Sequence, residues 1–85
     1  MSERYNSKVI PMTNRKFLRV KLAYLEMSER ELAEEMGCDY GGLLRKLNNR
    51  RYFSAYDIYI IGKILKLQPE EILEIFFSPE YLDAE

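Results

Sequence analysis

The sequence contains no histidine and only one cysteine among its 85 residues. A lone cysteine cannot close a disulfide within the chain, and without histidine or a cysteine cluster there is no Cys/His zinc site. The absence of histidine also excludes Ser-His and Cys-His catalytic pairs. Because no phosphate-binding glycine motif is present either, we expect no enzyme activity, no metal, no cofactor and no small-molecule ligand.

Long apolar runs are also missing. The longest two, Ile58 to Leu65 and Ile72 to Phe77, are interrupted by Lys63 and Glu74. Both fall far short of the roughly 20 residues that a membrane-spanning helix needs. The first residues of the chain are polar and charged, unlike the apolar region of a signal peptide. We therefore expect a cytoplasmic protein without a membrane partner.

The net charge is only −1, but the charge is distributed in blocks. Residues 1–25 and 40–66 each carry a net +5, whereas residues 26–39 carry −5 and residues 67–85 carry −6. Exposed charges act over a screening length of about 8–10 Å, so local patches decide what a surface attracts. The two basic blocks keep a nucleic-acid partner open; the alternative is that they are ordinary solvated helix faces.

The residue pattern predicts an all-α chain. A single domain, residues 14–77, is expected between an N-terminal arm (1–13) and an acidic C-terminal tail (78–85). Its helices are expected at about 14–25, 29–36, 40–48, 55–66 and 70–77, the fourth being the central one because it is apolar on nearly all sides.

Local signals mark the ends of these helices. Thr13 is the expected cap of the first helix, and Asp39 that of the third. The second and fourth helices are expected to begin with capping boxes, at residues 28–31 and 54–57. Gly37 suits the left-handed conformation that ends a helix, and proline at position 69 suits the first turn of the fifth.

The strongest functional signal lies in residues 28–48. The two helices expected here have eight or nine residues each, and only residues 37–39 separate them. Helices joined by so short a turn must cross at a steep angle. Ala33 supplies a small residue at the crossing, Gly37 the turn, and Leu43 an apolar anchor on the second helix. This is a helix-turn-helix pattern, whose second helix can enter a major groove about 12 Å wide.

The segment Met27 to Gly37 resembles the motif of the Cro and phage-repressor (XRE-like) helix-turn-helix family: an apolar residue, Ser/Thr, Gln, two variable residues, Leu-Ala, two variable residues, and an apolar residue before Gly. Residues 55–56, 62–67 and 70–71 are similar to the fourth and fifth helices of the lambda repressor DNA-binding domain. The resemblance covers about residues 13–77. It implies a five-helix lambda-repressor-like fold and sequence-specific binding of double-stranded DNA, usually as a homodimer. The implied role is a transcriptional regulator, a repressor of phage, mobile-element or antitoxin type, in a bacterial or phage setting.

The resemblance also implies site residues. Base contacts would come from the third helix, at Tyr40, Gly41, Gly42, Leu44 and Arg45. Phosphate contacts would come from Arg15, Lys46, Asn48, Arg50, Arg51 and Tyr52, with Arg4 and Lys8 of the arm beside them. A dimer contact would involve Phe76, Phe77, Tyr81 and Leu82. The alternative is that these residues belong to the core of the domain and to a frayed C-terminal tail. Among these, Arg45 best suits a guanine, since its forked guanidinium matches O6 and N7.

Several residues depart from the family pattern, among them Gly41 and Gly42, which bring no side chain to read bases. Glu29 replaces the usual Gln, so it would accept a hydrogen bond from cytosine or pair with Arg45. Lys46 occupies a normally apolar position, either because the helix is rotated or because its stem lies along the core edge. Leu44 is expected to point outward, toward a thymine methyl group or a protein. These departures support an alternative function, a helix-turn-helix scaffold that acts as a protein-binding module or inhibitor.

Two further expectations concern residues outside the motif. Cys38 is expected to be a buried, inert thiol. Tyr24, Tyr56 and Tyr59 are expected at the edge of the core with their hydroxyl groups in water.

Overall fold

Five helices make up most of residues 12–77, the part of the chain that the computed structural model describes. They are α1 (Arg15–Tyr24), α2 (Glu29–Met36), α3 (Tyr40–Leu47), α4 (Ala55–Leu65) and α5 (Pro69–Phe76). No strand occurs within those residues, so the all-α prediction is confirmed, and each helix end lies within one residue of its expected position. The remainder of the predicted arm, residues 1–11 with Arg4 and Lys8, and the predicted tail, with Tyr81 and Leu82, lie outside the described residues.

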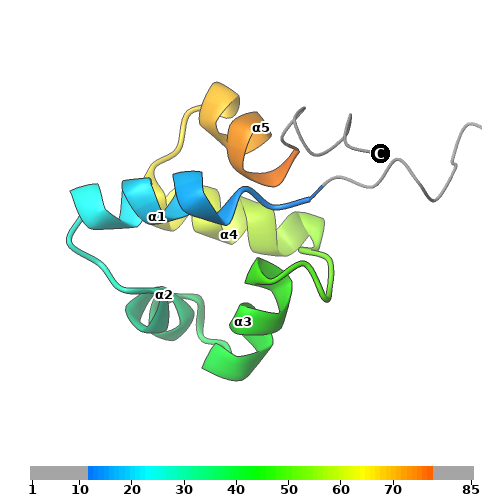
Figure 1. Ribbon diagram of the computed structural model, residues 1–85. Coiled ribbons are helices and arrows are strands. Elements are labelled where there is room, and N and C mark those ends of the chain that lie inside the picture. The colour runs from blue at the N-terminus through cyan, green and yellow to red at the C-terminus, as the bar shows by residue number, and fades with distance from the viewer. Residues whose placement is uncertain (1–11, 78–85) are drawn as a thin grey trace, which may run out of the picture.

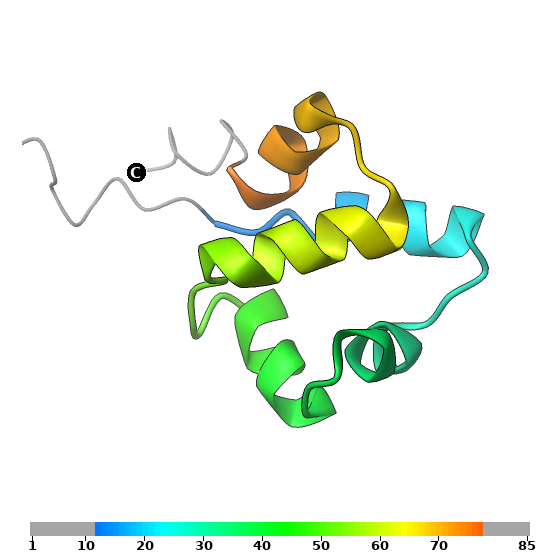
Figure 2. The same cartoon turned by 180° about the vertical axis from the view of Figure 1, so that it is seen from behind.

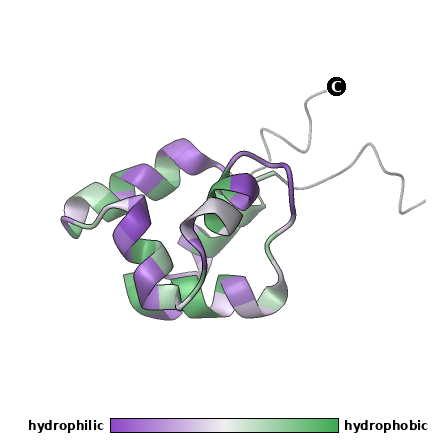
Figure 3. Cartoon of the chain, turned by 90° about the horizontal axis from the view of Figure 1, so that it is seen from below, coloured by the Kyte–Doolittle hydropathy of each residue, from purple (hydrophilic) through white to green (hydrophobic). Residues whose placement is uncertain are grey.

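Helix α4 runs through the middle of the fold (Figures 1 and 2). Helix α5 lies on one side of it, and α2 and α3 lie on the other (Figure 1). The central position predicted for this apolar helix is therefore confirmed. Each helix carries both hydrophilic and hydrophobic residues (Figure 3), as expected when one side of a helix is buried and the other is solvated.

The core takes apolar side chains from all five helices. They are Leu18, Leu22, Leu32, Ala33, Leu43, Leu47, Ile61, Leu65, Ile75 and Phe76. The ring of Phe53, in the loop before α4, meets the ring of Phe76 edge to face at 5.1 Å between centroids. Phe76 is only 4% exposed, so its ring is not available for the expected dimer contact. For this residue the other expectation, a place in the core, is confirmed.

Two predicted capping boxes are confirmed. Ser28 and Glu31 exchange side-chain to backbone hydrogen bonds at the start of α2, and Ser54 and Asp57 do so at the start of α4. Gly37 ends α2 with φ +73°, the left-handed conformation expected there.

The expected cap at Thr13 is wrong. Asn14 caps α1, its Oδ1 accepting a hydrogen bond from Phe17 N at 3.1 Å. Thr13 is buried instead, and its N–H donates to Asn49 Oδ1 at 2.8 Å. Asn14 N–H also donates to Ile75 O at 2.6 Å. The segment before α1 is therefore held between the exit of α3 and the end of α5.

The structure also corrects the expectations for Cys38 and three tyrosines. Cys38 is exposed in the turn between α2 and α3, not buried. Tyr24, Tyr56 and Tyr59 are well exposed rather than lying at the core edge, with Tyr24 reaching 82%. None of the five helices has the length and apolar character required to cross a bilayer.

Candidate nucleic-acid interface

Helices α2 and α3 form a tight angular unit (Figure 1). Only residues 37–39 connect them. Gly37 turns the chain, and Asp39 then caps α3, its Oδ2 accepting a hydrogen bond from Gly42 N at 2.9 Å. Ala33 of α2 and Leu43 of α3 are both buried, so a small side chain on one helix lets the other approach it closely. The connection and the packing together fix the direction of α3.

Helix α3 has one buried and one outward side. Leu43 and Leu47 are buried. At about 100° per residue, the opposite side consists of Gly41, Gly42 and Arg45. The Arg45 side chain is exposed, and the two glycines have no side chain to cover the backbone. The outward side of this helix therefore consists of backbone at the two glycines and one cationic side chain, that of Arg45.

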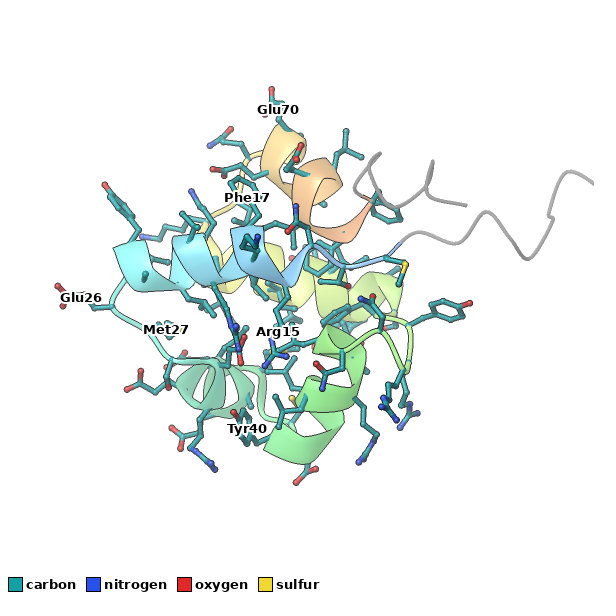
Figure 4. The ribbon with its side chains drawn as sticks, viewed as in Figure 1. Arg15, Phe17, Glu26, Met27, Tyr40 and Glu70 are labelled. Atoms are coloured by element: carbon teal, nitrogen blue, oxygen red, sulfur yellow. The ribbon has the colours of Figure 1, made fainter. Side chains whose placement is uncertain are left out.

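Glu29, at the start of α2, lies at the centre of a charge cluster. Its carboxylate accepts hydrogen bonds from Arg15 Nε at 3.0 Å, Arg15 Nη2 at 2.7 Å and Arg19 Nε at 3.1 Å. Arg15 also donates from Nη1 to Asn48 Oδ1 at 2.6 Å. In Figure 4, Arg15 extends from α1 toward the space between α2 and α3. One guanidinium thus links α1 to the beginning of α2 and to the end of α3.

The cluster shifts the pKa of both partners toward their charged forms. The hydrogen bonds from Arg15 hold the pKa of Glu29 below its ordinary value, outweighing the opposite effect of burial. The hydrogen bond with Glu29 raises the pKa of Arg15. The expected pair of Glu29 with Arg45 is therefore wrong, because the carboxylate pairs with two arginines of α1. Its side chain is only 11% exposed, and the expected contact with cytosine stays a prediction.

Lys46 also forms an ion pair within the protein. Its Nζ donates to Asp57 Oδ2 at 2.6 Å, and the same oxygen accepts from Ser54 N at 3.0 Å. Burial alone would raise the pKa of Asp57, but the bonds from Lys46 and Ser54 outweigh it and lower that pKa. Lys46 Nζ lies 6.0 Å from the centroid of the Phe53 ring. Of the two expected explanations for this residue, the stem along the core edge is the one observed.

Two more residues of α3 pack toward the protein. Leu44 is half-buried against the core, so the expectation that it points outward is wrong. Tyr40 is also half-buried, and the guanidinium of Arg30 lies over its ring at 4.3 Å from the centroid. Sequence reasoning missed this role of Arg30, although its position near the start of α2 is visible in the sequence.

The loop after α3 carries exposed cations. Asn49 adopts a left-handed conformation with φ +62°, and Arg50 N–H donates to Arg45 O at 2.8 Å, which closes the end of α3. Arg50, Arg51 and Tyr52 follow with exposed side chains. Neither arginine forms an ion pair with any residue between 12 and 77. Among the residues that the structure describes, Arg45 and this loop therefore supply exposed cations that form no ion pair.

Comparisons with protein-family models, with curated proteins and with solved structures found no match to this chain. In the described segment, no three carboxylate or thiol side chains come together as a metal site would require. We therefore infer function from the chain's own residues and their arrangement.

Proposed function

We propose that this protein is a transcriptional regulator of the Cro and phage-repressor type, with a lambda-repressor-like fold, that binds double-stranded DNA. In this proposal α3 enters the major groove, as the second helix of a helix-turn-helix does. The exposed loop residues Arg50 and Arg51 contact phosphates, which set affinity and orientation but not sequence.

The neutralisation of Glu29 is the observation that carries this proposal. A carboxylate at the start of α2 would repel a DNA backbone lying beside α3. Here Arg15 and Arg19 surround it, so three charged groups combine to a net positive cluster. Asn48, which Arg15 contacts through Oδ1, keeps its Nδ2 donors without a partner in the described part of the chain. The departure from the family motif is thus compensated by α1.

The test is the salt dependence of DNA binding, measured by fluorescence anisotropy on labelled duplex DNA. Arg50→Ala and Arg51→Ala should each weaken binding, and each should reduce the slope of log affinity against log salt by about 0.9. Lys63→Ala is the charge-matched control, because Lys63 lies on α4 rather than on α3 or its exit loop. Binding that does not respond to salt would refute the proposal.

A homodimer is part of the proposal, because a two-fold pair would match a palindromic site. Leu73 and Phe77 support it, since they are 59% and 38% exposed at the C-terminal end of the described residues. Sedimentation equilibrium of the wild type and of Leu73→Glu tests it. A wild type that stays monomeric at all concentrations would count against the dimer without affecting DNA binding by single subunits.

A protein-binding module is the second candidate function. It is favoured by the exposed acidic side of α2, where Glu31, Glu34 and Glu35 face solvent. Leu44, which this alternative would use as an outward contact, packs against the core instead. Glu34→Lys with Glu35→Lys should abolish capture of a basic partner in this case, and should strengthen or leave unchanged the binding of DNA in the first.

A further inference from the structure

Most side chains of α3 already have partners inside the protein. Tyr40 lies under a guanidinium, Lys46 is ion-paired, and the three leucines of α3 lie in or against the core. Asn48, which follows the helix, accepts the hydrogen bond from Arg15. Gly41 and Gly42 have no side chain. Within residues 12–77, Arg45 is therefore the one charged side chain of α3 that forms no ion pair.

The guanidinium of Arg45 lies beside Gly41. The two residues are one turn apart, and side chains on a helix lean toward its N-terminus. A Cβ atom at Gly41 would lie 4.0 Å from Arg45 Nη1 and only 3.0 Å from Asp39 Oδ2. At Gly42, a Cβ atom would meet Asp39 Oδ2 at 3.9 Å, an ordinary contact. An added methyl group at Gly41 would thus crowd the carboxylate of Asp39, which caps α3, and would lie in ordinary contact with Arg45 Nη1. At Gly42 it would crowd neither side chain.

We propose that Arg45 is the single base-reading side chain of α3, that it recognises guanine, and that Gly41 is a positioning residue for its guanidinium. This inference rests on the proposed DNA-binding function. Guanine presents O6 and N7 in the major groove, and the two outer nitrogens of arginine match them as a pair of donors. Lysine offers a compact point charge rather than a planar fork, so it would contact the two acceptors with less geometric selectivity. Sequence discrimination by α3 is then concentrated at one base pair per subunit.

The experiment begins with selection of the wild type on randomised duplex DNA at about 150 mM salt. Each guanine of the enriched sequence is then replaced by 7-deazaguanine, which lacks the N7 acceptor. At one guanine per subunit, the replacement should weaken wild-type binding about 5- to 100-fold. The same replacement should leave the binding of Arg45→Ala nearly unchanged, because alanine has no donor for N7. Arg45→Lys should show a smaller loss than the wild type, because its ammonium lacks the planar pair of donors.

Gly41→Ala and Gly42→Ala form the matched pair for the positioning role. Gly41→Ala should reduce discrimination between guanine and 7-deazaguanine, while the salt slope of binding stays at the wild-type value. Gly42→Ala should retain that discrimination. Circular dichroism confirms that each variant is folded. Arg45→Ala, which changes an exposed side chain, tests the guanine contact even if Gly41→Ala is unstable.

The outcomes separate this inference from the function it rests on. If Arg45→Ala keeps the wild-type guanine preference while binding DNA, the guanine contact is overturned and the DNA-binding function stands. If the two glycine variants lose discrimination equally, the positioning role of Gly41 is overturned. If the wild type binds no duplex at all, both the proposed function and this inference fail.

Discussion

Arg15 of α1 holds the carboxylate of Glu29 at the first turn of α2 through two parallel hydrogen bonds, Nε to Oε2 at 3.0 Å and Nη2 to Oε1 at 2.7 Å. This paired geometry is the strongest that an arginine and a carboxylate form. The remaining Nη1 of Arg15 reaches Asn48 after α3. The relationship therefore fixes three helices with respect to one another beside the proposed DNA-binding helix.

Glu29→Gln should lower the free energy of unfolding at neutral pH by about 1–2 kcal/mol, because Arg15 loses a partly buried charged partner. The pair with Arg19 adds little, since the Arg19 side chain is 60% exposed. Because the folded-state pKa of Glu29 is lowered from 4.5, its contribution is present above that pH and is lost as the pH falls through the folded value. Urea denaturation at neutral and acidic pH measures both effects. The stability difference between wild type and variant should shrink in acid.

Glu35→Gln is the control for this prediction. Glu35 is exposed on the same helix and forms no ion pair in the part of the chain that the structure covers. Its removal should change the stability by less than about 0.5 kcal/mol. Equal effects of the two substitutions would show that the Arg15 contact contributes nothing.

Lys46→Met should reduce stability by about 1 kcal/mol but leave the salt slope of DNA binding unchanged. Methionine keeps much of the side-chain volume and removes the bond to Asp57 Oδ2. Anisotropy titrations across a salt series check the slope, and thermal unfolding checks the stability. A slope reduced by about 0.9 would instead assign Lys46 to a phosphate contact.

Gly37→Ala should destabilise the fold by about 1–2 kcal/mol. The cost is conformational, since φ is +73° and an added Cβ would have no atom within 4 Å. Gly37→Asn is the comparison, because asparagine tolerates the left-handed region better and should recover part of the loss. Chemical denaturation of both variants gives the two differences. Equal stability of alanine and asparagine at this position would contradict the explanation.

Cys38 should react with a thiol reagent such as 5,5′-dithiobis(2-nitrobenzoic acid) in the native protein as readily as in denaturant. The reason is its exposure in the turn between α2 and α3. Cys38→Ser should change the free energy of unfolding by less than about 0.5 kcal/mol, as expected for a surface substitution. Slow, unfolding-limited labelling would show a protected thiol instead.

Phe76→Ala should lower stability by about 3–5 kcal/mol, because it removes a buried aromatic ring and its contact with Phe53. Phe77→Ala should leave the stability of the monomer nearly unchanged, since Phe77 is 38% exposed. Calorimetry at low protein concentration compares the two. If the Phe77 variant loses stability only at high concentration, the loss belongs to self-association.

Helix positions followed from the sequence because helix signals are local. Capping boxes span four residues, so Ser28 with Glu31 and Ser54 with Asp57 were predicted correctly. The three left-handed residues that are not glycine in the described part of the chain, Glu26, Asn49 and Lys66, were not predicted from the sequence. Thr13 was mistaken for a cap because its neighbour Asn14 is an equally good capping residue, and only the burial of Thr13 separates them.

The sequence by itself determined that this chain forms five short helices with an abrupt turn between the second and third, since periodicity and caps act over a few residues. Only the tertiary structure decided which charges meet. Arg15 and Glu29 are 14 residues apart, and Lys46 pairs with Asp57 across a loop. Such partners depend on how whole helices pack. That packing neutralised Glu29, turned Leu44 inward and left Arg45 as the exposed cation of α3.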